Sequence, residues 1–133
     1  MKYVLLYCIS LIHFIGTMQQ EKPLKQSIGD GSELYQDFCV QCHLDRGQGV
    51  HGSYPPLSNS DYLRENLEES IRAIKYGLKG EIQVNGVTYN GIMLRQGLDD
   101  EEVADVMNYI LSSWGNSLQK QITPTDVFNV QKK

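Results

Sequence analysis

Two cysteines three residues apart, with a histidine directly after the second, lie in the first half of this 133-residue chain, in the string CVQCH. Cysteine sulfur and imidazole nitrogen both bind metal ions, and a cysteine pair at this spacing is also suited to thiol–disulfide exchange. Cys39, Cys42 and His43 are therefore open to three interpretations. They are half of a zinc site, a thiol–disulfide switch, or a covalent anchor for haem.

The spacing of the three residues suits haem. Residues three apart on a helix lie on the same side, so Cys39 and Cys42 can meet two vinyl groups on one porphyrin edge. His43 follows directly and can offer an imidazole nitrogen to the iron. For this reason C-x-x-C-H is typical of the covalent attachment of haem c, the one cofactor that we predict.

The two alternatives lack the partners that they need. A zinc site of the C-x2-C…H-x3-5-H kind needs a second ligand pair, but His51 is the only histidine after His43 and no cysteine follows Cys42. A thioredoxin-like switch belongs in a βαβ context, and no such pattern is visible around the motif. Both alternatives remain open, since CxxCH strings also occur by chance in zinc proteins.

A closed electron-transfer haem needs a sixth iron ligand, which is often methionine. Of the four methionines, Met1 and Met18 lie in or beside the N-terminal segment, and Met107 lies on the apolar stripe of a predicted helix. Met93 lies in the irregular stretch YNGIMLRQGL, where it can be presented to a metal. We therefore predict that Met93 is the second axial ligand and that Met107 packs in the core.

His51 is a rival to Met93 for the iron. Only seven residues separate it from His43, and this short loop would have to wrap to the opposite face of the haem. The loop length therefore favours Met93.

Helical periodicity surrounds the cysteine motif. The apolar residues Leu34 and Phe38 predict a helix that begins near Gly31 and carries the cysteine pair. Residues 19–30 are polar and predict a linker, while the Gly- and Pro-rich residues 44–63 predict a loop.

Two later helices are predicted from their caps and apolar stripes. Asn66 and Glu69 predict a capping box for a helix that ends at Gly77, and Asp99 and Glu102 predict another for a helix that ends at Gly115. The last helix carries an amphipathic stripe of Val103, Val106, Met107, Ile110, Leu111 and Trp114.

A small hairpin and a tail complete the organisation. Asn85-Gly86 is a strong signal for a two-residue hairpin just before Met93. Residues 117–133 contain few apolar side chains and predict a tail that frays or forms one short turn of helix. We therefore predict one all-α domain over residues 31–116.

The N-terminal segment resembles a targeting signal. Lys2 is followed by an apolar run over residues 3–15, which is short for a membrane span. Residues 1–18 are therefore predicted to be a signal peptide or an N-terminal anchor, and Cys8 leaves with them if they are removed. The expected location is the periplasm, with membrane association only through this segment.

The charge balance excludes one class of partner. The formal net charge is −4, and the only basic cluster is the terminal Lys132-Lys133. Nucleic-acid binding needs a positive surface, so we predict no nucleic-acid partner. An acidic surface is also able to steer the chain to a basic patch on another protein.

Together these residues resemble a class I mono-haem cytochrome c of the bacterial periplasmic type. The resemblance covers roughly residues 31–116, through the helix that carries Gly31 and Tyr35, the CVQCH motif, the loop YPPL and the closing helix with Val106 and Tyr109. It implies an all-α fold of three or more helices around one covalent haem, with the closing helix crossing the first helix near Gly31.

The resemblance also implies a function and one further site residue. It implies a single-electron carrier, not an enzyme, with redox proteins as donor and acceptor. The backbone carbonyl of Pro55 is implied to accept a hydrogen bond from the axial histidine. Leu94 departs from the family pattern, in which proline often follows the methionine and stiffens its loop.

Two other functions remain open at this point. One is a cytochrome subunit of a larger dehydrogenase or oxidase complex, whose sequence would look the same. The other is a haem enzyme or sensor with an open iron position, in which Met93 would not bind the iron.

Overall fold

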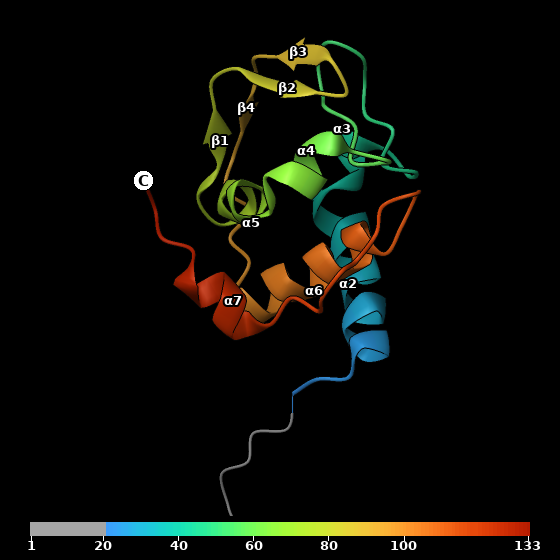
Figure 1. Cartoon of the computed structure of the whole chain (residues 1–133), viewed down its shortest axis with the longest axis vertical. Helices are drawn as coiled ribbons and strands as arrows, with labels where there is room; N and C mark the ends of the chain where they lie inside the picture. Colours follow the sequence, from blue (N-terminus) through green and yellow to red (C-terminus); the bar gives the residue numbers. More distant parts are fainter. Residues whose placement is uncertain (1–20) are drawn as a thin grey trace, which may run out of the picture.

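The computed structural model describes residues 21–133, so the predicted signal peptide or anchor at 1–18 lies outside the described residues. Residues 21–133 form six helices and four short strands, and helices dominate, as predicted (Figure 1). The helices are α2 (Leu24–Phe38), α3 (Val40–His43), α4 (Asp61–Glu65), α5 (Leu67–Tyr76), α6 (Asp100–Leu111) and α7 (Pro124–Asn129). The strands are β1 (Leu78–Lys79), β2 (Ile82–Val84), β3 (Val87–Tyr89) and β4 (Ile92–Met93). None of these described helices is long and apolar enough to span a bilayer.

The first and last long helices cross at a glycine. A Cβ atom added to Gly31 would lie 2.0 Å from the backbone oxygen of Asp105, so α2 and α6 approach more closely than any side chain permits. Next to this crossing the rings of Tyr35, Tyr109 and Trp114 pack on one another, with centroids 5.0 to 5.5 Å apart. The predicted crossing near Gly31 is therefore present.

Helix α2 begins earlier than the sequence predicted. Residues 24–30, predicted as part of a linker, form the first turns of α2, so the predicted domain start at residue 31 falls inside a helix. Two contacts to α6 explain the difference. The buried Ser27 donates to Asp105 Oδ1 at 2.6 Å, and Lys22 Nζ lies 2.7 Å from Asp105 Oδ2. Tertiary contacts therefore order a segment whose polar composition resembles a linker.

The predicted capping box at Asn66 is wrong. Helix α4, predicted as loop, runs up to Asn66, whose backbone N–H still bonds to the carbonyl of Tyr62. Asn66 is therefore held as the C-cap of α4, and its side chain makes no capping bond to α5. The cap that does form is Ser60, which accepts from the backbone N–H of Leu63 at the start of α4.

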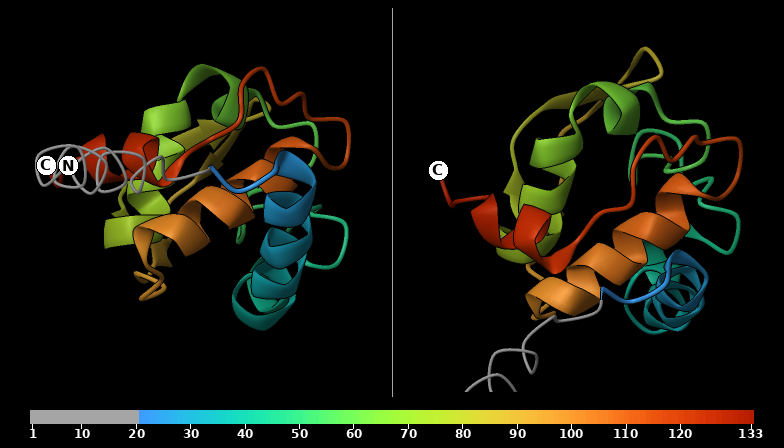
Figure 2. Two further views of the ribbon diagram at one scale, coloured as in Figure 1. Left: turned by 90° about the horizontal axis from the view of Figure 1, so that it is seen from below. Right: turned by 60° about the horizontal axis from the view of Figure 1, so that its bottom comes forward.

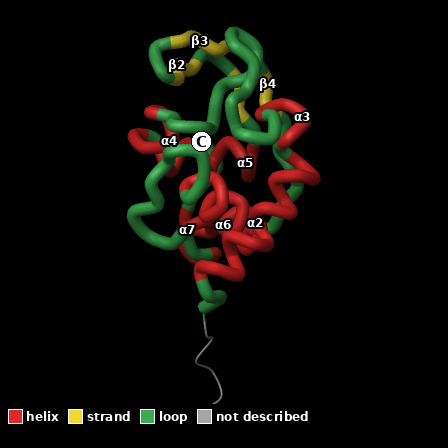
Figure 3. The backbone as a smooth tube through the Cα atoms, turned by 90° about the vertical axis from the view of Figure 1, so that its right-hand side faces the viewer, coloured by secondary structure: helices red, strands yellow, loops and turns green. Residues whose placement is uncertain are grey.

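The strands form two small antiparallel pairs that lie on one side of the helices (Figure 3). Strands β2 and β3 pair Val84 with Val87 around Asn85-Gly86, which confirms the predicted hairpin. Strand β4 pairs with β1, and this places Met93 opposite Leu78. The stretch around Met93 was predicted to be irregular, but the backbone bonds to β1 hold it in a defined strand.

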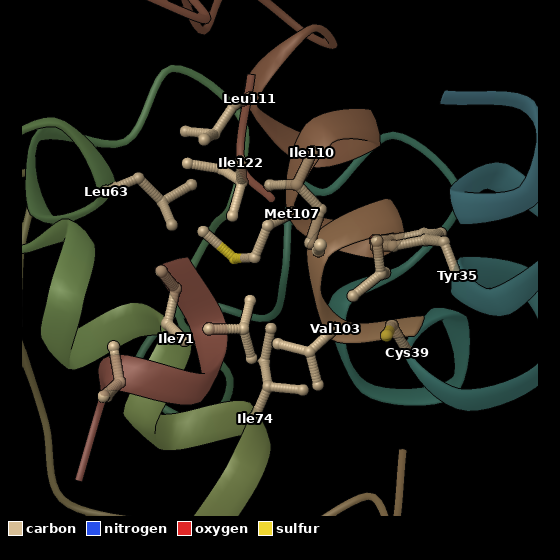
Figure 4. Close-up of a cluster of buried hydrophobic side chains, with 14 residues drawn as sticks. Tyr35, Cys39, Leu63, Ile71, Ile74, Val103, Met107, Ile110, Leu111 and Ile122 are labelled. Atoms are coloured by element: carbon tan, nitrogen blue, oxygen red, sulfur yellow. The ribbon is translucent and has the colours of Figure 1, made fainter. Parts of the chain in front are cut away.

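Helix α6 forms the centre of the core. Its predicted capping box is confirmed, since Asp99 accepts from Glu102 N while the Glu102 side chain accepts from Asp99 N. The helix ends at Leu111, before the predicted Gly115. Met107 is buried and lies in the middle of the cluster of apolar side chains (Figure 4).

The C-terminal segment forms a short helix, which is one of the two predicted alternatives, and it packs against the core instead of fraying. Residues 117–133 run back past α6 to α5 and include helix α7 (Figure 2). Ile122, Val127 and Val130 are buried in the core cluster. Thr123 and Asp126 form a capping box for α7, and Lys75 Nζ on α5 donates to the carbonyl of Val127 at 2.7 Å. A few apolar residues at suitable positions are enough to dock the whole segment.

We expect this docking to contribute to stability. Val127 is fully buried, so Val127→Ala should lower the free energy of unfolding by about 2 kcal/mol through lost burial and the cavity that remains. Phe128 is 65% exposed on the same helix, and Phe128→Ala should change it by less than about 0.5 kcal/mol. Denaturant titration of both variants measures the difference. Equal, small effects would show that the segment is not docked in solution.

Candidate haem site

The two cysteines lie at the junction of α2 and α3. Cys39 caps the end of α2 and is 9% exposed, while Cys42 lies in α3 and is partly exposed. Both thiols are free in the described part of the chain. Burial, together with the neighbouring Cys42, raises the pKa of Cys39 to about 11, so this sulfur is a neutral thiol at physiological pH. Cys39 is therefore not an activated thiolate, and the two cysteines form no disulfide within the described residues.

His43 is the last residue of α3 and is 8% exposed. Its Nδ1 atom lies 2.9 Å from the carbonyl oxygen of Pro55. A carbonyl oxygen only accepts, so Nδ1 carries the proton and donates it, which leaves the lone pair of Nε2 free in the neutral ring. Burial lowers the pKa of His43, although the bond to Pro55 opposes this in part. The neutral ring is the form that binds a metal.

Two backbone contacts that the sequence analysis missed hold the residues around His43. The N–H of Gly49 donates to the His43 carbonyl at 2.9 Å, and the Tyr35 hydroxyl donates to the Leu44 carbonyl at 2.6 Å. A Cβ atom added to Gly49 would lie 2.3 Å from the carbonyl oxygen of Tyr54. The closely spaced glycines of RGQGVHG could have predicted these contacts. Glycine has no Cβ atom, so it permits one backbone segment to pass close to a second one.

Cys39, His43 and Met93 line one cavity. It holds about 610 Å³ of space, including the part open to solvent. Met93 reaches it from β4 and is half-buried. The walls come from the Pro55 loop and from α4, α5, α6, β1 and β2, and they comprise Pro55, Pro56, Leu57, Ser60, Tyr62, Leu63, Ser70, Ala73, Ile74, Leu78, Ile82, Val84, Met107 and Ile110. Several of these side chains are labelled in Figure 4.

The chemistry of this lining fits a haem group. The described residues that line it include no Asp, Glu, Lys or Arg, and most are aliphatic. The hydroxyls of Ser60 and Ser70 are already bonded to Leu63 N and to the Asn66 carbonyl, so neither needs a polar ligand. The apolar ring of a porphyrin has no desolvation penalty on entering such a cavity. A bare metal ion, in contrast, would lose its hydration there. Residues 21–133 also contain no group of three or more His, Cys, Asp or Glu side chains placed to hold a metal ion.

The other two candidate iron ligands, His51 and Met107, are not free to bind at the cavity in the same way as Met93. His51 is exposed in the loop after His43 and is not among the residues that line the cavity. Met107 does line the cavity, but it is 1% exposed and packed inside the apolar cluster, as predicted. The structure thus brings Cys39, His43, Pro55 and Met93 together and leaves His51 outside.

Comparison with known proteins decides the family. The sequence model of the cytochrome c family matches residues 28–114. The chain belongs to the cytochrome c family. Cytochrome c-552 of Thermus thermophilus is 34% identical over 128 residues, which cover 78% of this chain and 95% of that protein. The predicted assignment to class I mono-haem cytochromes c and to their fold is confirmed.

Larger proteins also contain related domains. The cytochrome c subunit of a quinone alcohol dehydrogenase from Gluconacetobacter polyoxogenes is 30% identical over 101 residues, or 73% of this chain and 21% of that subunit. The fructose dehydrogenase cytochrome subunit of Gluconobacter japonicus is 30% identical over 93 residues, or 66% of this chain and 19% of that subunit. This cytochrome is therefore similar to nearly all of cytochrome c-552, and to about one fifth of each dehydrogenase subunit.

Membership of the family establishes the cofactor and the general function. This cytochrome binds haem c covalently, and it carries single electrons. When bound, the haem supplies the one-electron redox chemistry, while the protein sets its potential through ligands, burial and hydrogen bonds.

Proposed function

We propose that this cytochrome is an exported single-electron carrier with a closed iron site. Cys39 and Cys42 supply the thioether sulfurs, and His43 and Met93 supply the axial ligands. The observation that carries the proposal is the single apolar cavity into which α2–α3 brings Cys39 and His43 while β4 brings Met93. Histidine with methionine raises the potential of a haem and leaves no open position for a substrate.

The carbonyl of Pro55 positions the axial histidine. Its 2.9 Å contact with Nδ1 fixes the tautomer and restrains rotation of the ring, so Nε2 is the atom offered to the iron. Because Gly49 bonds to the His43 carbonyl from the same loop, the ring and its acceptor move together. Both contacts restrain the axial ring in one orientation.

A free carrier is the function that we favour over a subunit or an enzyme. The alignment with cytochrome c-552 covers 95% of that protein, so the matched part of this chain corresponds to nearly all of a small cytochrome. The dehydrogenase subunits are several times longer than their matched parts, and this cytochrome spans about a fifth of each. Its donor and acceptor are redox proteins at the periplasmic side of the membrane.

The coordination of the iron tests this proposal. We expect the ferric protein to have a six-coordinate low-spin spectrum with a Met–iron charge-transfer band and to titrate reversibly with one electron. Cyanide should bind slowly, because it must first displace Met93. A high-spin ferric spectrum with immediate cyanide binding would instead indicate an enzyme or sensor with an open iron position.

A further inference from the structure

A tryptophan in a strained backbone conformation follows the last long helix. Trp114 has a φ angle of 50°, which lies in the left-handed region that a large side chain rarely adopts. Such strain persists only where the surrounding structure holds the residue in place, and it is concentrated at functional sites. The contacts of residues 114–116 explain why Trp114 keeps this conformation.

Residues 114–116 lie beside the loop of residues 44–60 that joins α3 to α4 (Figure 1). The carbonyl of Trp114 accepts a hydrogen bond from the backbone N–H of Asn59 at 3.0 Å. Asn59 is also in the left-handed region, with a φ angle of 44°. Two strained residues, far apart in the sequence, therefore meet in one hydrogen bond.

Asn116 adds three side-chain hydrogen bonds. Its Nδ2 atom donates to the carbonyl of Leu57 at 2.7 Å and to the carbonyl of Ile110 at 3.0 Å. Its Oδ1 atom accepts from the backbone N–H of Ser60, the buried N-cap of α4, at 3.1 Å. One side chain thus connects the loop at two points to the last turn of α6.

The Trp114 ring packs against the start of the same loop. A Cβ atom added to Gly47 would lie 2.6 Å from Cε3 of the ring, so the backbone at Gly47 directly contacts the indole. The carbonyl of Gly47 accepts from the N–H groups of Leu57 at 2.7 Å and of Ser58 at 2.8 Å. The two ends of the loop are therefore bonded to each other beside the tryptophan.

We propose that Asn116 is a positioning residue for the axial histidine and that it acts through Pro55, with Trp114 holding the same loop. The inference rests on the proposed function and adds residues that do not line the cavity. Pro55 lies in this loop, and its carbonyl accepts the proton of His43 Nδ1 at 2.9 Å. Because residues 57–60 are fixed to α6, the acceptor stays in place and the imidazole keeps one orientation.

Asn108 provides a matched control for a purely structural role. It lies on α6, is fully buried, and also makes three side-chain hydrogen bonds. Its partners are the Ser27 hydroxyl and both backbone groups of Ile122, and none of them belongs to the loop that carries Pro55. Asn108→Ala should therefore lower global stability at least as much as Asn116→Ala, without affecting the acceptor of the histidine.

Exchange of the His43 Nδ1 proton for deuterium measures the proposed role. The proton is followed by NMR in the reduced holoprotein, where the signals of an axial ligand are shifted by the haem. It exchanges when its bond to the Pro55 carbonyl opens, and a loop opens locally more often than the whole protein unfolds. We expect Asn116→Ala to accelerate this exchange on the order of tenfold or more, because three hydrogen bonds are lost. Asn108→Ala should change it by less than about twofold.

Asn116→Asp is a milder variant. Aspartate keeps the shape of the side chain and the acceptor for Ser60, but it cannot donate to the carbonyls of Leu57 and Ile110. It should also accelerate the exchange, and it replaces the alanine variant where alanine prevents haem attachment. Denaturant titration of each variant gives the change in global stability for comparison.

The outcomes separate the possible explanations. Unchanged exchange in the Asn116 variants would overturn the proposal. An equal acceleration in Asn108→Ala would also overturn it, since the loss of global stability would then explain the result. If the His43 ring signals of the unsubstituted holoprotein show no haem shift, His43 is not an axial ligand, and the proposed function fails whatever the exchange rates are.

Discussion

Substitution of Met93 by alanine is expected to abolish the Met–iron charge-transfer band and to lower the reduction potential. Met93 lies in β4, which pairs with β1 and places Met93 opposite Leu78. Its side chain lines the same cavity as His43. Alanine has no thioether, so the iron would lose the proposed ligand, which favours its reduced state. The decrease should be on the order of 0.1 V or more, within the roughly 0.8 V range over which axial ligands set haem potentials. Spectra and redox titration of purified holoprotein measure both effects.

Met107 supplies the control for this experiment. It also lines the cavity, but it is packed inside the core of α6. Met107→Leu conserves its volume and should retain the charge-transfer band at a cost below about 1.5 kcal/mol in stability. The assignment of Met93 would be overturned if Met93→Ala kept the band and Met107→Leu lost it.

A methyl group at Gly31 is expected to destabilise the fold strongly. The added Cβ of Gly31→Ala would lie 2.0 Å from the backbone oxygen of Asp105 and 3.0 Å from the Cβ of Tyr109. Because the obstructing atom belongs to a helix backbone, α2 and α6 must separate, which loosens the packing around Tyr35. We expect a loss of about 3 kcal/mol in the free energy of unfolding, at the upper end for overpacking.

Gly29 lies on the same helix and provides the matched control. A Cβ atom at Gly29 meets nothing within 4 Å. Gly29→Ala should therefore raise the free energy of unfolding by about 0.5–1 kcal/mol, because alanine loses less backbone entropy than glycine in a helix. Denaturant titration of the two holoproteins should give shifts of opposite sign. Shifts of the same sign would show that the close helix crossing does not govern stability.

The residues that meet at the cavity could be named from the sequence because they belong to local motifs. The spacing in CVQCH predicts the attachment residues, and the other methionines were set aside because they lie in a helix or in the N-terminal segment. The hairpin at Asn85-Gly86 and the cap at Asp99 were also predicted, since each depends on a few adjacent residues. Such signals do not require knowledge of the tertiary structure.

The ends of the domain were not predictable in the same way. Residues 24–30 are helical because Ser27 and Lys22 contact Asp105, which lies on the last long helix. The segment 117–133 is ordered because Val127 and Val130 are buried in the core cluster beside α5 and α6. Both results depend on contacts between residues far apart in the sequence, and composition alone favours a linker and a tail.

The intact mass of the exported protein tests the central claim most directly. The chain is expressed with a haem-attachment system, purified and denatured before mass spectrometry, so that only covalent haem remains. We predict a single species that carries one haem, and the loss of this added mass when Cys39 and Cys42 are both replaced by serine. A mass equal to that of the bare polypeptide would contradict the account, because Cys39 and Cys42 would then hold no haem.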